Sequence, residues 1–179
     1  MVSDQTLPSG HPELSRRGTA EGEAAARLPA MESESLNAED HVSVHRAVRE
    51  LSDRYPHVLT LSARLGAWAD LVVDVEEGLD AVWAWDFEQD VVDRDWLHDA
   101  WPILTERVRR LCQPELDALD DRFRAATAPI GSPGAPGVPG APEGAEEERW
   151  WQSRYPLRVT GDPLTRLPPT WSPAPTYVG

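Results

Sequence analysis

The sequence contains no lysine, because all 17 basic residues among its 179 residues are Arg. This absence excludes several classes of enzyme. A Walker-type phosphate loop uses a Lys to reach the nucleotide phosphates, and Schiff-base or pyridoxal phosphate chemistry requires a Lys amine. The chain also lacks the Gly-x-Ser-x-Gly and Gly-x-Gly-x-x-Gly motifs of hydrolase nucleophiles and dinucleotide sites.

Cysteine is almost absent too, since Cys112 is the only one. A single Cys cannot form an internal disulfide, which excludes a disulfide-stapled secreted scaffold and favours a reducing compartment. We expect the Cys112 thiol to lie in the core rather than to act as a nucleophile. Residues 1 to 38 contain no apolar run of signal-peptide length, and no stretch of about 18 apolar residues could span a bilayer. These features predict a soluble, cytoplasmic protein that does not bind membranes.

Basic residues are scarce relative to acidic ones, with 31 Asp and Glu giving a formal net charge of -14. Such a charge repels phosphate backbones, so we expect no binding to nucleic acid. A charged partner should instead be a basic protein. The chain length is enough for one hydrophobic core and too short for two.

Composition divides the chain into four parts. Residues 1–37 are rich in Ser, Glu, Pro, Gly and Ala, and are predicted to be disordered, with Met31 as an alternative start. Residues 38–128 form a predicted helical domain. Residues 129–145 include the sequence GSPGAPGVPGAP and are predicted to be a Pro/Gly-rich linker. Residues 146–179 form a tail that begins with a cluster of aromatic and Arg residues.

Helical spacing of apolar residues dominates the second part. The first predicted helix is capped by Asn37 or Asp40 and stopped by Pro56. The second carries an apolar seam from Val58 to Leu79 in alternating steps of three and four residues. We expect this seam to be used inside the fold, which favours a monomer over a homodimer.

The next two predicted helices depend on capping and on proline. Asp99 can cap a third helix that has Pro102 in its first turn, and Pro114 starts or kinks a fourth. About four amphipathic helices with short connections predict an all-α fold. Its architecture would be a small up-and-down bundle with a disordered N-terminal tail and a Pro/Gly-linked C-terminal tail.

The helical period breaks between the second and third helices. Residues 83–88 alternate apolar with small or acidic side chains, which is typical of an extended segment. Residues 157–160 are the comparable stretch, and a pairing between the two would bring the tail back onto the bundle. The alternative interpretation is a helical turn or loop whose Trp side chains fill the end of the core.

The acidic charge is concentrated between residues 70 and 99. This stretch contains eleven Asp or Glu residues and one Arg, a net charge of -10. One interpretation is a solvated face opposite Arg107, Arg109 and Arg110 on the next helix. The other is a docking surface for a basic protein, since aromatic anchors ringed by charge are typical of interface centres. Its predicted partner-binding residues are Trp83, Trp85, Asp86, Glu88, Asp90, Asp93, Trp96, Trp150, Trp151 and Tyr155.

Some of the same acids could bind a metal. Their spacing on a helix can present carboxylates on one face, as magnesium-dependent phosphate-ester hydrolases require. The pattern resembles the all-α nucleoside triphosphate pyrophosphohydrolases, in which a Glu-Glu pair and a further acid precede a second acidic pair. That resemblance implies a Mg²⁺ site made by Glu76, Glu77, Asp80, Asp90 and Asp93.

The sequence therefore predicts a non-enzymatic protein–protein interaction module, such as an adaptor or an immunity-like inhibitor, with no cofactor and no metal. The first alternative is a Mg²⁺-dependent all-α nucleotide phosphohydrolase. The second is a structural subunit of a larger assembly.

Overall fold

Two helices form where the apolar spacing predicts them, in a computed structural model that describes residues 36–55, 57, 59–130 and 148–179. Helix α2 (Ala38–Leu51) begins at Asn37, whose side chain accepts a hydrogen bond from the backbone N–H of Asp40. The Asp40 carboxylate accepts one from the backbone N–H of Asn37 in return. This capping box satisfies two N–H groups that a helix start leaves without partners. Helix α3 (Leu61–Glu77) buries most of the predicted seam.

The remaining long helices divide the chain differently from the prediction. Helix α5 (Val92–Ala100) ends where the third helix was expected to begin, and Asp99 does not cap a helix. Helix α6 (Glu106–Ala126) begins at Thr105 and runs through Pro114. The prediction that a helix starts at Pro114 is therefore wrong, whereas a kink at this residue stays a prediction. Pro114 is exposed, so water can satisfy the Arg110 carbonyl that loses its helical N–H partner.

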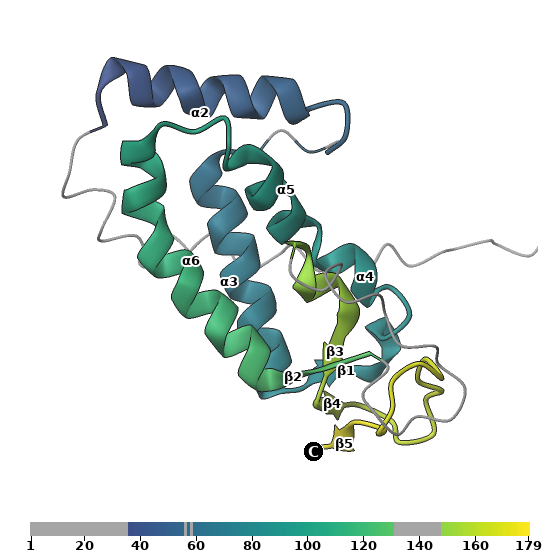
Figure 1. Cartoon of the computed structure of the whole chain (residues 1–179). Helices are drawn as coiled ribbons and strands as arrows, with labels where there is room; N and C mark the ends of the chain where they lie inside the picture. The colour runs from purple at the N-terminus through teal and green to yellow at the C-terminus, as the bar shows by residue number, and fades with distance from the viewer. Residues whose placement is uncertain (1–35, 56, 58, 131–147) are drawn as a thin grey trace, which may run out of the picture.

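Helices α3, α5 and α6 pack side by side, and α2 runs across one end of them (Figure 1). The side chains of Leu65, Trp68, Val72 and Phe123 are completely buried between these helices. The ring centroids of Trp68 and Phe123 lie 4.7 Å apart. The core therefore sits around α3, which contacts both α5 and α6.

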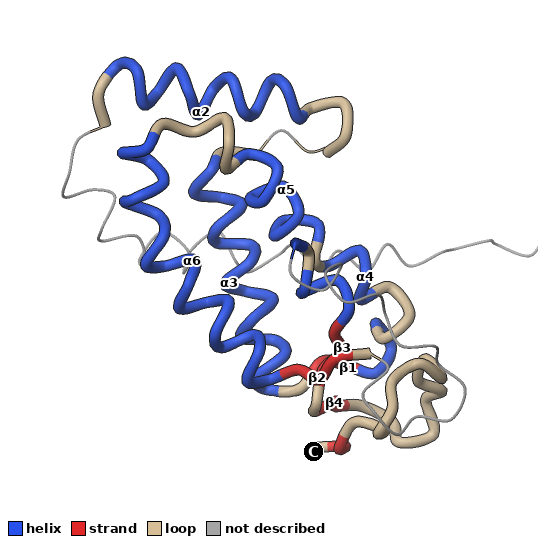
Figure 2. The backbone as a smooth tube through the Cα atoms, viewed as in Figure 1, coloured by secondary structure: helices blue, strands red, loops and turns tan. Residues whose placement is uncertain are grey.

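Short strands make the fold mixed α and β, so the all-α prediction is wrong. Strand β3 (Arg154–Pro156) pairs antiparallel with β2 (Thr127–Pro129), which directly follows α6. Strand β4 (Arg158–Thr160) lies between β1 (Leu79–Asp80) and β5 (Thr176–Tyr177) and is parallel to both. These strands gather at the end of the helices away from α2 (Figure 2). Each has two or three residues, too few for the alternation that identifies a strand in sequence.

The C-terminal segment, defined here as residues 148–179, supplies part of the hydrophobic core. After a 3₁₀ helix (Trp150–Ser153), it buries four large side chains: Trp151, Tyr155, Val159 and Trp171. The ring of Trp171 lies 5.7 Å from that of Tyr155 and 5.9 Å from that of Phe87. The aromatic residues predicted in this tail therefore complete the core that the helices begin.

The segment after α3 is helical rather than extended. Residues 81–83 form a 3₁₀ helix and Phe87–Asp90 form the short helix α4. The buried residues Ala81, Ala84, Phe87 and Val91 are three, three and four positions apart, which is a helical spacing. The prediction of a strand over residues 83–88 is wrong because this spacing outweighs the local alternation. The predicted strand at residues 157–160 does exist, but it pairs with Leu79–Asp80 instead.

Gly78 makes the turn from α3 into β1. Its φ is +116°, a conformation that L side chains rarely adopt. A Cβ atom on this residue would lie 2.8 Å from Cγ2 of Val178 and 3.0 Å from Cγ2 of Thr160. A glycine is therefore required for the sheet to pack this closely against the end of α3.

Two predicted segments fall largely outside the described residues, namely the disordered N-terminal tail and the Pro/Gly-rich linker. Among the residues that the structure describes, no helix is long and apolar enough to cross a membrane.

Candidate functional site

An exposed surface lies on the outer side of the segment that follows α3. The residues between the buried positions point outward, and three of them are large and apolar: Val82 is 62 %, Trp85 57 % and Val92 37 % exposed. Asp80, Asp86 and Glu88 in the same segment are also exposed. We call this surface the acidic tryptophan face, and it consists of Asp80, Val82, Trp85, Asp86, Glu88 and Val92.

Trp85 is held in place although most of its side chain is exposed. Its indole Nε1–H donates a hydrogen bond of 2.7 Å to the backbone carbonyl of Arg166 in the C-terminal segment. Leu164, two residues before Arg166, is 89 % exposed. The C-terminal segment therefore fixes the Trp85 indole through Arg166, and it exposes the apolar side chain of Leu164 two residues earlier.

Several acids of the predicted acidic stretch have Arg partners and do not belong to this face. Glu76 forms a two-pronged pair with Arg122, with N–O distances of 2.9 and 2.5 Å. Asp93 lies 2.6 Å from the buried Arg64. Neither cation is one of those predicted to face the stretch, and Arg107 lies instead 3.6 Å from Asp40.

Arg149 joins the C-terminal segment to α5. Its guanidinium lies 3.1 Å from Asp95 and also hydrogen-bonds Asp99. Asp99 accepts two further hydrogen bonds, of 2.8 Å from the Tyr55 hydroxyl and 2.5 Å from Arg54. Arg149 therefore links the C-terminal segment to two acids of the predicted acidic stretch.

A buried ion pair lies behind this contact. Arg94 on α5 donates two hydrogen bonds to Asp120 on α6, at 2.9 and 2.8 Å, and Asp120 also accepts from the Trp68 indole at 3.2 Å. The Arg94 guanidinium lies 4.0 Å from the ring centre of Trp151. Sequence reasoning missed this group, which links three helices and the C-terminal segment.

The predicted partner-binding residues are divided between the core and the surface. Trp96, Trp151 and Tyr155 are at most 2 % exposed, so they are unavailable to a partner in this conformation. Trp150 and Trp83 are partly buried. Exposed members are Trp85, Asp86 and Glu88, while Asp90 and Asp93 are partly buried at the edge of the same segment.

The predicted magnesium ligands do not form a cluster in the described part of the chain, where no group of three His, Cys, Asp or Glu residues is placed to hold a metal. Glu76 and Asp93 are paired with arginines. The Asp80 side chain accepts a hydrogen bond from the backbone N–H of Val82. Magnesium binding by this set stays a prediction.

The single thiol is placed as predicted. Cys112 is 1 % exposed, and burial raises the pKa of its thiol to about 11. A thiol with such a pKa is almost entirely protonated at neutral pH, and the protonated form is a poor nucleophile.

Asp99 makes the stability of the contact with the C-terminal segment dependent on pH. Burial acts to raise its pKa, but hydrogen bonds from Tyr55 and Arg54 and the charge of Arg149 outweigh it, and the pKa lies below the ordinary value of 3.8. A lowered folded-state pKa stabilises the fold above the unfolded value. This stabilisation is lost as the pH falls from about 5 through 3.8 towards the folded pKa.

We therefore expect Asp99→Asn to flatten the acid limb of the stability curve. The free energy of unfolding, measured by urea titration at a series of pH values, should fall less steeply below about pH 5 in the variant than in the wild type. The exposed Asp53→Asn serves as the control for removing one carboxylate. Equal slopes for the wild type and Asp99→Asn would contradict the prediction.

Comparison with protein-family models, with curated proteins and with solved structures finds no match to this chain.

Proposed function

We propose that the protein is a non-enzymatic protein–protein interaction module that binds a basic partner through the acidic tryptophan face. The observation that carries the proposal is the exposure of Trp85 on a segment, residues 79–93, that contains five acidic residues and no basic one. Large aromatic side chains bind well at interface centres because they bury much area for few rotatable bonds.

Charge selects the class of partner. Asp80, Asp86 and Glu88 lie among the apolar residues of the face along the chain and are all exposed. A basic protein would neutralise them, whereas an acidic one would meet repulsion across the whole surface. Because such carboxylates act over a Debye length of about 10 Å at 0.1 M salt, association with the partner should slow as salt is added.

Preorganisation supports the same surface. The hydrogen bond from the Trp85 indole to the Arg166 carbonyl fixes the ring before any partner arrives. A fixed anchor loses little conformational entropy on binding, and more of the buried apolar area then appears as affinity. A cytoplasmic setting belongs to this proposal, since the one Cys of the chain is buried and can form no internal disulfide.

The test is quantitative affinity capture from host lysate with the full-length protein and two variants. Trp85→Ser removes the anchor, and Val42→Ser makes a comparable change at a residue of α2 that is 64 % exposed and lies outside the face. We expect the wild type and Val42→Ser to retain the same stoichiometric basic protein at about 0.05 M salt and to lose most of it at about 0.3 M. Trp85→Ser should retain about tenfold less, the size of effect typical of an interface anchor.

Two outcomes would overturn the proposal. One is that no stoichiometric basic protein is retained even at low salt. The other is that Trp85→Ser and Val42→Ser retain equal amounts, because a partner that ignores Trp85 does not bind the acidic tryptophan face.

A further inference from the structure

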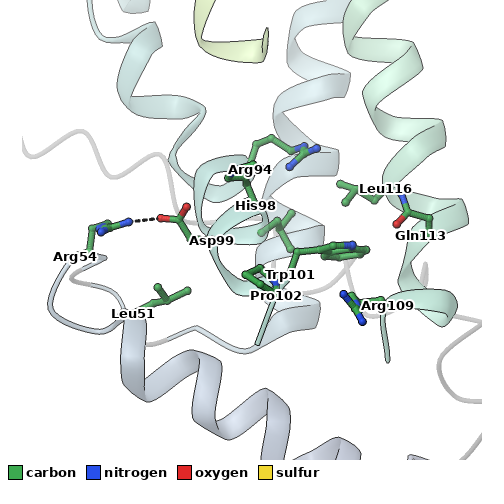
Figure 3. Close-up of a pocket in the computed structure, with 11 residues that line it drawn as sticks. Leu51, Arg54, Arg94, His98, Asp99, Trp101, Pro102, Arg109, Gln113 and Leu116 are labelled. Atoms are coloured by element: carbon green, nitrogen blue, oxygen red, sulfur yellow. Dashed lines mark hydrogen bonds and ion pairs between the residues drawn. The ribbon is translucent and has the colours of Figure 1, made fainter. Parts of the chain in front are cut away.

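A cavity of about 580 Å³ opens between α2, α5 and α6, on a part of the surface distinct from the acidic tryptophan face (Figure 3). Its volume lies within the range of about 300 to 1,000 Å³ that is common for small-molecule sites. The lining comes from the end of α2, from α5 with the turn that follows it, and from the first half of α6. The residues that line it include Leu51, Arg54, Asp99, Trp101, Arg109 and Leu116.

The charge of the cavity is opposite to that of the protein as a whole. Three arginines line it, and Asp99 is the one acidic residue among the lining residues. Arg54 is paired with Asp99, and Arg94 with Asp120 behind the wall. In a chain with a net charge of -14, this group of arginines makes the cavity a local site of positive charge.

Arg109 is the arginine of the cavity whose guanidinium donors are available to a ligand. It lies on α6, one turn before Gln113, and it is partly buried at the cavity wall. Its guanidinium forms no hydrogen bond or ion pair with the residues that the structure describes, whereas the neighbouring Gln113 is occupied by Asp117 at 2.6 Å. A guanidinium offers a planar pair of donors that matches a carboxylate or a phosphate.

The rest of the lining is apolar and includes one flat surface. Figure 3 shows the Trp101 indole among the side chains that line the cavity, together with Arg109, Leu116 and Leu51. Trp101 directly follows the last residue of α5 and is partly buried. An indole and a guanidinium that line one cavity provide two surfaces in it, one for a ring and one for an anion.

We propose that this cavity binds a small aromatic anion, with the anionic group on Arg109 and the ring against Trp101. The shared chemistry is an aromatic ring bearing a carboxylate or a phosphate. This site is independent of the proposed partner surface, because none of its lining residues belongs to the acidic tryptophan face.

The test is calorimetric titration of the full-length chain with four probes. These are 1-naphthoate, 1-naphthyl phosphate, the uncharged 1-naphthalenemethanol and inorganic phosphate. We expect saturable one-to-one binding of at least one aromatic anion, and which of the two naphthyl anions binds more tightly identifies the anionic group. The uncharged ring and the bare phosphate should each bind about tenfold more weakly, because each lacks one of the two contacts.

A matched pair of variants locates the site. Arg109→Gln should weaken the binding of the better aromatic anion about tenfold, whereas Arg110→Gln, at the next and exposed residue of α6, should leave it unchanged. The proposal is overturned if no aromatic anion binds saturably, if the uncharged probe binds as tightly as the anions, or if both variants change the affinity equally. The probe series on the wild type decides the matter even if Arg109→Gln fails to fold.

Discussion

Replacing Trp151 by Ala should lower the free energy of unfolding by about 3–5 kcal/mol, the usual cost of removing a large buried aromatic side chain. Trp151 is 1 % exposed, its indole donates a 2.8 Å hydrogen bond to Asp95, and Arg94 stacks on its ring. The substitution leaves a cavity in the core and an unstacked buried cation. Urea unfolding followed by circular dichroism measures the effect.

The same substitution at an exposed tryptophan is the control. Trp85→Ala removes an identical number of atoms from a side chain that is 57 % exposed. It should cost about 1 kcal/mol or less, mainly through the lost hydrogen bond to the Arg166 carbonyl. If the two variants were equally stable, Trp151 would not be part of the core.

Asp120→Ala should have an effect of similar size, about 3–5 kcal/mol, because it leaves the buried Arg94 without its counter-charge. Both side chains of this pair are about a tenth exposed. The Trp68 indole loses its acceptor at the same time. Asp121→Ala is the matched control, since Asp121 is the next residue of α6, is 79 % exposed and pairs with Arg124 at the surface. It should change stability by about 0.5 kcal/mol or less.

The double variant Arg94→Met, Asp120→Ala sharpens this prediction. Removing both charges avoids an uncompensated buried ion, so the double variant should be more stable than the sum of the two single losses implies. Additive losses would show that the two residues do not act as a pair. The measurement is again urea unfolding at a pH near neutrality.

The sequence predicts the first half of the fold well because its signals are local. The Asn37 cap and the seam along α3 can each be recognised within one continuous stretch of sequence, and both are confirmed. The positions of the later helices are harder to predict from the sequence. A proline usually ends a helix or bends it. The helix continues through Pro114 because this residue lies on the solvent-exposed side of α6.

The pairing of the strands could not be predicted for another reason, although a strand at residues 157–160 was expected. The segments that pair, such as Leu79–Asp80 with Val159–Thr160, are short and far apart in the sequence. Their hydrogen bonds require the C-terminal segment to lie against the helices, where Trp151 and Tyr155 are buried. Composition predicts that those aromatic residues are important, but it does not distinguish a core residue from a binding residue.

The candidate site was also predicted only in part. The concentration of charge between residues 70 and 99 is visible in the sequence, and Trp85, Asp86 and Glu88 are exposed members of it. A charged residue within an apolar helix stripe could have been used to predict a buried ion pair. Arg64 lies between Leu61 and Leu65, and Asp120 lies beside Leu119, and both are buried in ion pairs.

The docking of residues 148–179 onto the helices sets both the acidic tryptophan face and the buried charge network, since it supplies Arg166 and Trp151. Native-state hydrogen exchange of the full-length chain tests this docking most directly. The amides of Leu157, Thr176 and Val178, which donate to backbone carbonyls of Ala126, Leu157 and Val159, should be protected like those of α6. Exchange of these amides as fast as in an unfolded peptide of the same sequence would contradict it.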